Sequence, residues 1–310
     1  MTSSLVGSEM CIRDRNWAKL TNRGYELSLS TVNVKTKDFR WVMDFNLAHN
    51  KSKINRLNVR DNSYEPSREG YSVGAVFSLK TAGLDENGLQ MFYNKQGEKV
   101  SFNDFFGLEY GYMMGGLIPF LKSNLSAEEY RNLFTYEGTT EPKFTGGWIN
   151  RFYYKNFDLT VSASFVLDQT VQEQPFYNPV QTSPGQNYSR RMSQIWSPDN
   201  TSGKYPRIMG TYTEGEENWA YQWLGMLDPG NSYRKYDYWF KKMSYMRINS
   251  IRLGYTFPER LLGHICFSSA RISFETRNPF VFGSSYKGYF DPETYGNIYT
   301  QPLAKTFSCG

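Results

Sequence analysis

The stretch "WVMDFNLAHN" at residues 41–50 alternates between apolar and polar side chains with a period of two. From Phe39 to Leu47 every odd position is apolar, and among the even positions only Val42 is apolar. On an α-helix the odd positions would be spread around the whole circumference, whereas on a β-strand they share one face. The stretch is therefore predicted to be a strand with one apolar face, which contacts either a protein core or lipid.

The same alternation recurs along the chain. It is clear in "YELSLS" (25–30), "FDLTVSASFVL" (157–167), "INSIRLGYTF" (248–257) and "SARISFET" (269–276), whereas "GGWINRFYYK" (146–155) carries aromatic residues at both parities. We therefore predict an all-β, antiparallel fold. It has seven strands that form an open curved sheet, at residues 24–34, 39–50, 145–154, 157–167, 244–257, 268–276 and 304–310.

The lengths of the connections favour lipid as the contact of the apolar face. The links at 35–38, 155–156 and 258–267 are short, and the segments at 51–143, 168–238 and 277–303 are long. Short turns at one end and long loops at the other are typical of an outer-membrane β-barrel, while long loops are uncommon in compact soluble domains. We predict a partial transmembrane β-barrel with long extracellular loops. The predicted lipid-facing residues are Trp41, Met43, Phe45, Leu47, Leu159, Val161, Phe165, Leu253 and Tyr255.

The opposite face would be costly to expose to lipid. It would carry Arg40 and Asp44 into hydrocarbon, and an arginine alone costs roughly 2–4 kcal/mol at the midplane of the membrane. A half-buried sheet in a soluble all-β domain that binds a glycan or a protein explains the alternation equally well, so it stays open as the alternative.

Composition excludes several other classes. The 310 residues include 24 Tyr and 22 Phe, the mean hydropathy is −0.60, and no apolar run approaches the roughly 18 residues of a membrane-spanning helix. The net charge of +5 comes without a Lys/Arg block, which argues against nucleic acid as a partner. Cys11, Cys266 and Cys309 are too far apart in sequence to predict a disulfide framework or a zinc site. We predict no enzymatic activity, catalytic residue, metal site or cofactor, because His49 and His264 lack any nucleophile–base pattern.

The first residues differ from the rest. "MTSSLVGSEMCIRDR" lacks both the alternation and the features of a signal peptide, and it resembles translated adapter sequence found at the ends of assembled genes. We expect residues 1–15 to be a non-native segment and residues 16–310 to carry the fold.

Three short motifs lie in the predicted loops. "LSAEEYRNLF" (125–134) predicts a short helix that begins with a capping box of Ser126 and Glu129. "LDENG" (84–88) predicts a turn, because it lacks the remaining ligands of a calcium loop. "NWAYQWLG" (218–225) spaces three aromatic residues two apart, and flat aromatic faces stack on sugar rings. These candidate contacts to a substrate, or alternatively to a partner protein or the loop itself, are Trp219, Tyr221 and Trp223.

Several segments together resemble the late barrel of SusC/RagA-type TonB-dependent outer-membrane transporters. They are "NRGYELSLSTVNVKTKDFRWVMDFNLAHNKSKI" (22–54), "EGYSVGAVFSLKTAGLDENGLQMFYNKQGE" (69–98), "PKFTGGWINRFYYKNFDLTVSASF" (142–165), "IWSPDNTSGKYPRI" (195–208), "YWFKKMSYMRINSIRLGYTFP" (238–258), "GYFDPE" (288–293) and "QPLAKTFSCG" (301–310). They follow the family's order and cover nearly everything from about residue 16 onward.

The resemblance implies an importer of oligosaccharides or oligopeptides in the cell outer membrane. Its implied partners are outer-membrane lipid, a SusD-like surface lipoprotein and, through a plug domain, the TonB complex. The plug and the TonB box that precede this region in the family are not found in the sequence. The chain also ends at Gly310, before the family's terminal aromatic residue. We therefore expect the C-terminal portion of a transporter barrel, with the strands at 24–34 and 304–310 as two unpaired edges.

Overall fold

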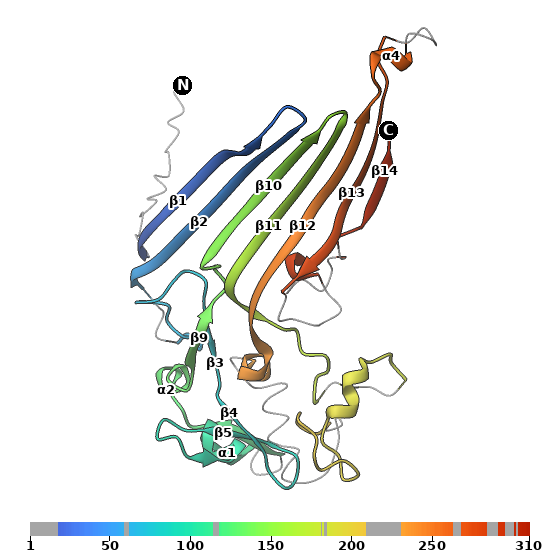
Figure 1. Cartoon of the computed structure of the whole chain (residues 1–310). Coiled ribbons are helices and arrows are strands. Elements are labelled where there is room, and N and C mark those ends of the chain that lie inside the picture. Colours follow the sequence, from blue (N-terminus) through green and yellow to red (C-terminus); the bar gives the residue numbers. More distant parts are fainter. Residues whose placement is uncertain are drawn as a thin grey trace, which may run out of the picture.

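The computed structural model describes residues 18–58, 62–113, 118–180, 182, 185–208, 231–262, 268–283, 291–294, 301 and 303–310. Its main element is a seven-stranded antiparallel sheet with the order β1-β2-β10-β11-β12-β13-β14 (Figure 1). The strands are β1 (Ala18–Lys35), β2 (Phe39–Leu57), β10 (Phe144–Tyr154), β11 (Phe157–Gln172), β12 (Phe240–Thr256), β13 (Arg271–Phe282) and β14 (Thr306–Cys309).

The predicted all-β fold and the open sheet are confirmed. β1 and β14 are the outer members of the sheet and do not pair with each other. Several strands are longer than the alternation indicates: β1 begins at Ala18 because its pairing with β2 continues as far as Leu57. β12 likewise begins at Phe240, which pairs with Gln172 beyond an irregularity in the ladder. Pairing therefore extends past the positions where apolar residues alternate.

Short and long connections lie at opposite ends of the sheet (Figure 1). The β1–β2 turn is closed by the Thr36 N–H, which donates to the Phe39 carbonyl at 2.8 Å. In the β10–β11 turn Lys155 has a φ of 51°, the left-handed backbone expected of a tight hairpin. The third short connection contains α4 (Glu259–Leu262). At the other end the long segments fold into small structures of their own.

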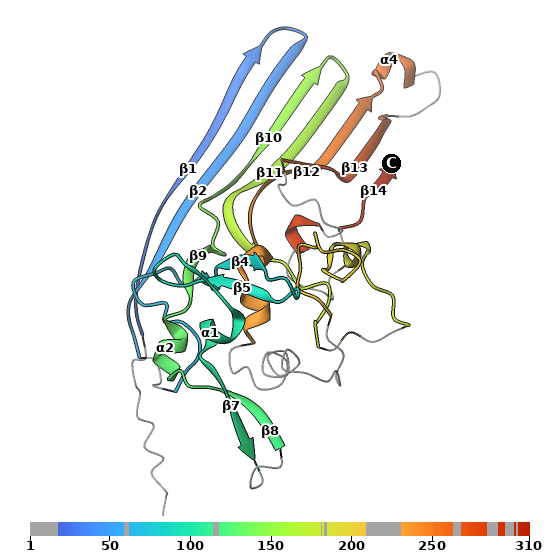
Figure 2. The same cartoon turned by 90° about the horizontal axis from the view of Figure 1, so that it is seen from below.

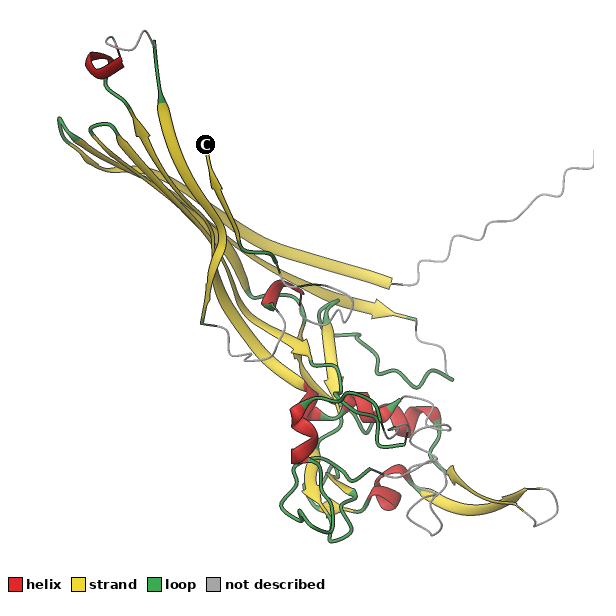
Figure 3. Ribbon diagram, turned by 90° about the vertical axis from the view of Figure 1, so that its right-hand side faces the viewer, coloured by secondary structure: helices red, strands yellow, loops and turns green. Residues whose placement is uncertain are grey.

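These outer segments contain short strands and helices (Figures 2 and 3). Figure 2 shows that the β7–β8 hairpin projects away from the rest. The strands are β3 (Ala75–Ser78), β4 (Thr81–Leu84), β5 (Gln90–Tyr93), β6 (Lys99–Val100), β7 (Leu108–Met113), β8 (Ile118–Ser123) and β9 (Thr135–Thr139). The helices are α1 (Phe102–Phe106), α2 (Ala127–Arg131), η2 (Arg190–Gln194), η4 (Ser232–Lys235), η5 (Asp237–Trp239) and η7 (Pro292–Thr294). Within the described ranges no helix has the length and apolar character needed to cross a membrane.

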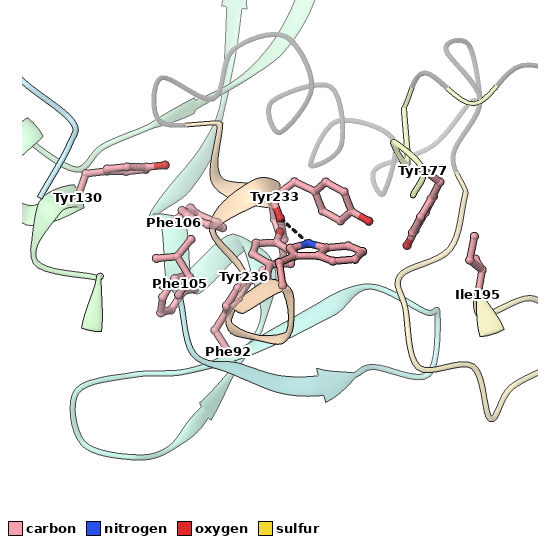
Figure 4. Close-up of a cluster of buried hydrophobic side chains, with 11 residues drawn as sticks. Phe92, Phe105, Phe106, Tyr130, Tyr177, Ile195, Tyr233 and Tyr236 are labelled. Carbon is pink, nitrogen blue, oxygen red and sulfur yellow. Dashed lines mark hydrogen bonds between the residues drawn. The ribbon is translucent and has the colours of Figure 1, made fainter. Parts of the chain in front are cut away.

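A cluster of buried hydrophobic side chains lies among the outer segments. Trp239 and Tyr236 are fully buried in this cluster, and Figure 4 shows Tyr236 near Phe92 and Phe106. The Trp239 indole Nε1 donates to the Tyr233 carbonyl at 3.0 Å, which satisfies the only polar atom of that side chain. Burial of one large apolar side chain stabilises the folded state by about 1.5–3 kcal/mol. The outer segments therefore form a packed layer at one end of the sheet.

Two local predictions are confirmed in this layer. In α2 the Ser126 hydroxyl accepts from the Glu129 N–H, and the Glu129 carboxylate accepts from the Ser126 N–H, which is a complete capping box. In the predicted turn the Gly88 N–H donates to the Asp85 carbonyl at 3.1 Å. Gly88 has a φ of +77°, and a Cβ there would overlap the ring of Trp196, so the position requires glycine.

Candidate functional site

The first candidate surface is the apolar face of the sheet, which the register assembles from separate strands. Trp41 pairs with Phe152, Phe152 with Leu159, Leu159 with Leu253, and Leu253 with Phe274. Paired residues on antiparallel strands project to the same side. One row across the sheet therefore consists entirely of apolar side chains.

All nine residues predicted to face lipid lie on this one side of the sheet. Neighbouring rows pair Phe45 with Trp148, Met43 with Asn150, and Phe157 with Tyr255. Rings on this face contact one another, as in Trp41 and Phe152, whose centroids are 5.7 Å apart. The nine are Trp41, Met43, Phe45, Leu47, Leu159, Val161, Phe165, Leu253 and Tyr255.

Much of this face is exposed in the structure. The side chains of Leu253, Ile272 and Phe274 are 46%, 57% and 44% exposed, respectively. The core of the outer segments does not extend over these residues. An exposed apolar surface that continues across several strands is unusual for a protein in water. It indicates a contact with lipid or with another protein.

The opposite face carries polar and charged side chains that pair across strands. Asp44 accepts hydrogen bonds from Arg151 on the next strand and from the Ser30 hydroxyl, the latter at 2.7 Å. The hydroxyls of Ser162 and Ser250 are 2.8 Å apart. Farther along, two hydrogen bonds of 2.7 and 2.8 Å join Arg271 to the carboxylate of Asp158. This face can retain water and polar solutes.

Asn150 departs from the separation of apolar and polar faces. Asn150 lies on the apolar face, where its Oδ1 accepts a hydrogen bond of 3.0 Å from the Trp41 Nε1. The pair lets the indole remain on an apolar surface with its N–H satisfied. The sequence gives little indication of this bond, because Asn150 lies in the strand where both parities carry aromatic residues.

A buried ion cluster joins the sheet to a distant loop. Arg247 is 2% exposed and donates to Asp291 and Glu293, the latter at 2.8 Å. Tyr245, two residues before Arg247 on the same strand, is also buried. Nothing in the spacing of the sequence predicts this contact, because the carboxylates lie 44 and 46 residues after the arginine.

Two hollows in the outer layer are lined by residues that the structure describes. One, of about 600 Å³, is lined by the charged groups Glu65, Arg68 and Lys235 together with Phe77 and Phe240. The Lys235 ammonium and the Glu65 carboxylate are 3.3 Å apart. The other, of about 640 Å³, lies beside the outer end of β2 and is lined by both cations and anions. Neither hollow was predicted from the sequence, since their linings come from segments far apart in the chain.

Burial changes the ionisation of the aromatic core. Burial raises the pKa of the Tyr177 and Tyr233 hydroxyls well above the ordinary tyrosine value. The Tyr177 hydroxyl donates to the Pro206 carbonyl at 2.6 Å. Both hydroxyls are therefore neutral near neutral pH, and the Tyr177 hydroxyl joins two segments of the layer through its hydrogen bond.

The candidate aromatic residues and the two histidines differ in whether the structure describes them. Trp219, Tyr221, Trp223 and His264 lie outside the described residues. His49 packs between the rings of Tyr25 and Phe144, and its Nδ1 lies 2.6 Å from the Lys143 carbonyl. Among the described side chains no group of three or more His, Cys, Asp or Glu residues could hold a metal ion.

The fold and its two faces define a class of protein. An antiparallel sheet that is apolar on one face and polar on the other, with short turns at one end and folded loops at the opposite end, is the wall of a transmembrane β-barrel. No family model matches the chain.

Individual known proteins do match. The chain is 27% identical over 297 residues to TonB-dependent receptor P3 of Formosa agariphila, a match that covers 90% of this chain and 26% of that protein. It is 24% identical over 306 residues to TonB-dependent receptor SusC of Bacteroides thetaiotaomicron, with 96% of this chain and 26% of that protein covered.

Solved structures agree on the fold. A structure of the RagAB peptide transporter matches 94% of this chain and 29% of its own chain, with a TM-score of 0.63 and 20% identity. The RagAB peptide importer in the closed-closed state matches 93% and 29% of the two chains, also with a TM-score of 0.63 and 20% identity. The chain is thus similar over most of its length to SusC-like TonB-dependent receptors, and it spans about a quarter of the length of the curated relatives it matches.

Proposed function

We propose that this chain forms part of the barrel wall and the extracellular loops of a TonB-dependent importer in the cell outer membrane. The observation that carries the proposal is the unbroken apolar row from Trp41 to Phe274 on one face of an open sheet. In the proposal that face contacts lipid and the charged face lines the lumen.

The length of the apolar segment supports this role. From Phe39 to His49 the strand advances about 33 Å, which at the usual tilt of a barrel strand gives a height of about 25 Å. Barrels carry an outward apolar band of about that height. The proposed nine lipid-facing residues lie within the band or at its edges.

The partners in this proposal follow from the relatives. The similarity to TonB-dependent receptors supports transport that is powered through the TonB complex, which acts on a plug domain in such a receptor. The similarity to SusC and to RagAB supports a SusD-like surface lipoprotein over the extracellular loops.

The proposed substrate is an oligosaccharide or an oligopeptide. RagAB is described as a peptide transporter, which supports the second class for a chain of similar fold. We propose Trp219, Tyr221 and Trp223 as contacts to substrate or to the lipoprotein, because their aromatic side chains suit both kinds of contact. The charged and aromatic lining of the 600 Å³ hollow suits a polar ligand of either class.

The test of the wall assignment is a pair of adjacent substitutions in the complete receptor. Val161→Arg would place a cation on the apolar face and Ser162→Arg on the polar face, in the same strand. We expect Val161→Arg to destabilise the inserted barrel by roughly 2–4 kcal/mol and Ser162→Arg by much less. The measurement is urea unfolding of the receptor refolded into phosphatidylcholine vesicles. Equal effects of the two variants would contradict the assignment of the faces.

A further inference from the structure

A row of cations continues the apolar face of the sheet toward its loop end. We call the five residues Lys19, Arg23, Lys51, Lys53 and Arg56 the basic ladder. Arg23 pairs with Lys51, Lys19 pairs with Arg56, and Lys53 follows Lys51 by two residues. All five side chains are exposed.

The strand pattern fixes the side on which the ladder lies. Along β2 the residues Leu47, His49, Lys51 and Lys53 are two apart with no irregularity between them, so their side chains share one face. Ser52 and Ile54, at the alternate positions, are buried on the other side. The ladder is therefore a direct extension of the apolar face.

The order of residues along this face follows the layers of a lipid leaflet. Leu27 and Leu47 pair in the apolar band, Tyr25 and His49 come next with ring centroids 5.0 Å apart, and the cations follow. Aromatic rings concentrate at the boundary between hydrocarbon and water, and cations gather where phosphate groups lie. From Leu47 to Lys51 the strand advances about 13 Å, a distance that suits the change from hydrocarbon to headgroup.

The neighbouring anions do not neutralise the ladder. Among the described residues none of its five side chains lies within ion-pair distance of a carboxylate. Glu26 pairs with Ala48 and so projects to the opposite face. Glu69 accepts from the Leu57 N–H, and Glu141 accepts from the Ser52 hydroxyl.

The 640 Å³ hollow lies beside two members of the ladder. Lys51 and Lys53 line it together with Tyr71 and Tyr136, whose stacked rings have centroids 4.8 Å apart. Its lining also includes Lys143 and Lys242 and the anions Glu137, Glu141 and Asp168. An aromatic surface next to cations suits the polar part of a lipid headgroup.

We infer that the basic ladder binds the phosphate groups of anionic lipid headgroups in the leaflet on the loop side of the membrane. This inference rests on the proposed function, because the ladder reaches lipid only if the apolar face spans the membrane. The ladder then anchors the wall at a fixed depth and selects phosphorylated lipids as neighbours. Each cation near an anionic lipid surface strengthens the contact by about fivefold at low salt.

The experiment uses the complete receptor purified in a non-ionic detergent and titrated with lipids in native mass spectrometry. Phosphatidylglycerol and phosphatidylcholine with identical acyl chains are compared. We expect the receptor to bind phosphatidylglycerol at least about fivefold more tightly, and added salt to reduce the difference. The variant Arg23→Gln/Lys51→Gln/Lys53→Gln should lose this preference and keep its binding of phosphatidylcholine, which also checks that it folds.

A matched control removes the same charge from the polar face. The variant Arg40→Gln/Arg252→Gln/Arg277→Gln should keep the preference, because these residues pair within the opposite face. Competition by inorganic phosphate alone would identify a site for free phosphate and overturn the lipid assignment. Equal affinities for the two lipids in the unmodified receptor would overturn the inference while leaving the membrane function intact. A receptor that binds neither lipid and needs no detergent would overturn both.

Discussion

In the proposed barrel, single side chains decide which face of each strand meets lipid, and the polar residue Asn150 on the apolar face is informative. Its Oδ1 accepts a hydrogen bond from the Trp41 N–H on a mostly apolar face. A donor left without a partner in an apolar environment costs about 1–3 kcal/mol, so the amide compensates for the polarity of the indole. Without this hydrogen bond, the polar amide of Asn150 would be unfavourable on an apolar face.

This pair gives a prediction at the residue scale. Asn150→Leu should destabilise the complete receptor by about 1–3 kcal/mol, because the Trp41 indole loses its acceptor. In a Trp41→Phe background the same substitution should cost much less, since no donor remains. Urea unfolding of the four proteins in detergent measures the coupling. Additive effects would contradict the hydrogen bond.

Ser162 is a better site than Thr160 for the control arginine that is compared with Val161→Arg. Thr160 follows Leu159, which we propose faces lipid, but Thr160 pairs with Arg151 on one side and Arg252 on the other. An arginine at Thr160 would therefore meet two like charges. Ser162 pairs with Ile149 and Ser250, so it reports on the environment of the face alone.

Among the elements, α2 has a start that its sequence specifies and its contacts confirm. The hydrogen bonds from Ser126 lower the pKa of Glu129, and they stabilise the first turn of the helix. Ser126→Ala should destabilise this turn by about 1 kcal/mol. Because the pKa of Glu129 is lower in the folded chain, its contribution should be lost as the pH falls through that value. Faster amide exchange across residues 127–131 is the measurement, and unchanged exchange would contradict the cap.

The aromatic layer gives a prediction at alkaline pH. Tyr177 and Tyr233 keep their protons to higher pH in the folded chain than in the unfolded chain, because burial raises the pKa of both hydroxyls. Their stabilising contribution is fully present below about pH 10 and shrinks as the pH rises above it. Ultraviolet titration of tyrosinate should show fewer groups ionising in the folded receptor than in urea. Tyr177→Phe should remove one late-titrating group, and an unchanged number of late-titrating groups in this variant would contradict the burial of the hydroxyl.

The sequence predicts elements well where a local period exists, and poorly where contacts are distant. The alternation in 39–47 and 157–167 predicts strands and the residues that share a face, and the spacing of Ser126 and Glu129 predicts a cap. The aromatic core is assembled from segments such as β5, α1 and η5, which share no common period. The contacts of Arg247 with Asp291 and Glu293 and the linings of both hollows are likewise products of the tertiary fold.

At the scale of the whole molecule, the sheet is an open surface with apolar residues on one side. β1 and β14 form its two edges, and Leu27 on β1 and Phe307 on β14 are 51% and 68% exposed. Unpaired strand edges cannot span hydrocarbon, because each unsatisfied backbone group costs several kcal/mol there. The wall therefore functions only as part of a closed barrel.

This openness predicts the behaviour of the chain produced alone. Residues 16–310 should require detergent or associate, since both the apolar face and the edges are available to other chains. Size-exclusion chromatography with light scattering, with and without detergent, measures this. A soluble monomer with a cooperative thermal transition in plain buffer would support the alternative of a soluble all-β binding domain.

We propose that the two faces of the sheet meet lipid and water, respectively. A spin-label scan of residues 158–165 tests this arrangement in the complete receptor, reconstituted in phosphatidylcholine vesicles after its native cysteines are replaced by serine. We expect labels at residues 159, 161, 163 and 165 to be accessible to oxygen, which dissolves in lipid. Labels at 158, 160, 162 and 164 should be accessible to a water-soluble nickel chelate. Uniform accessibility along the strand, or the opposite alternation, would show that the two faces do not meet lipid and water in this way.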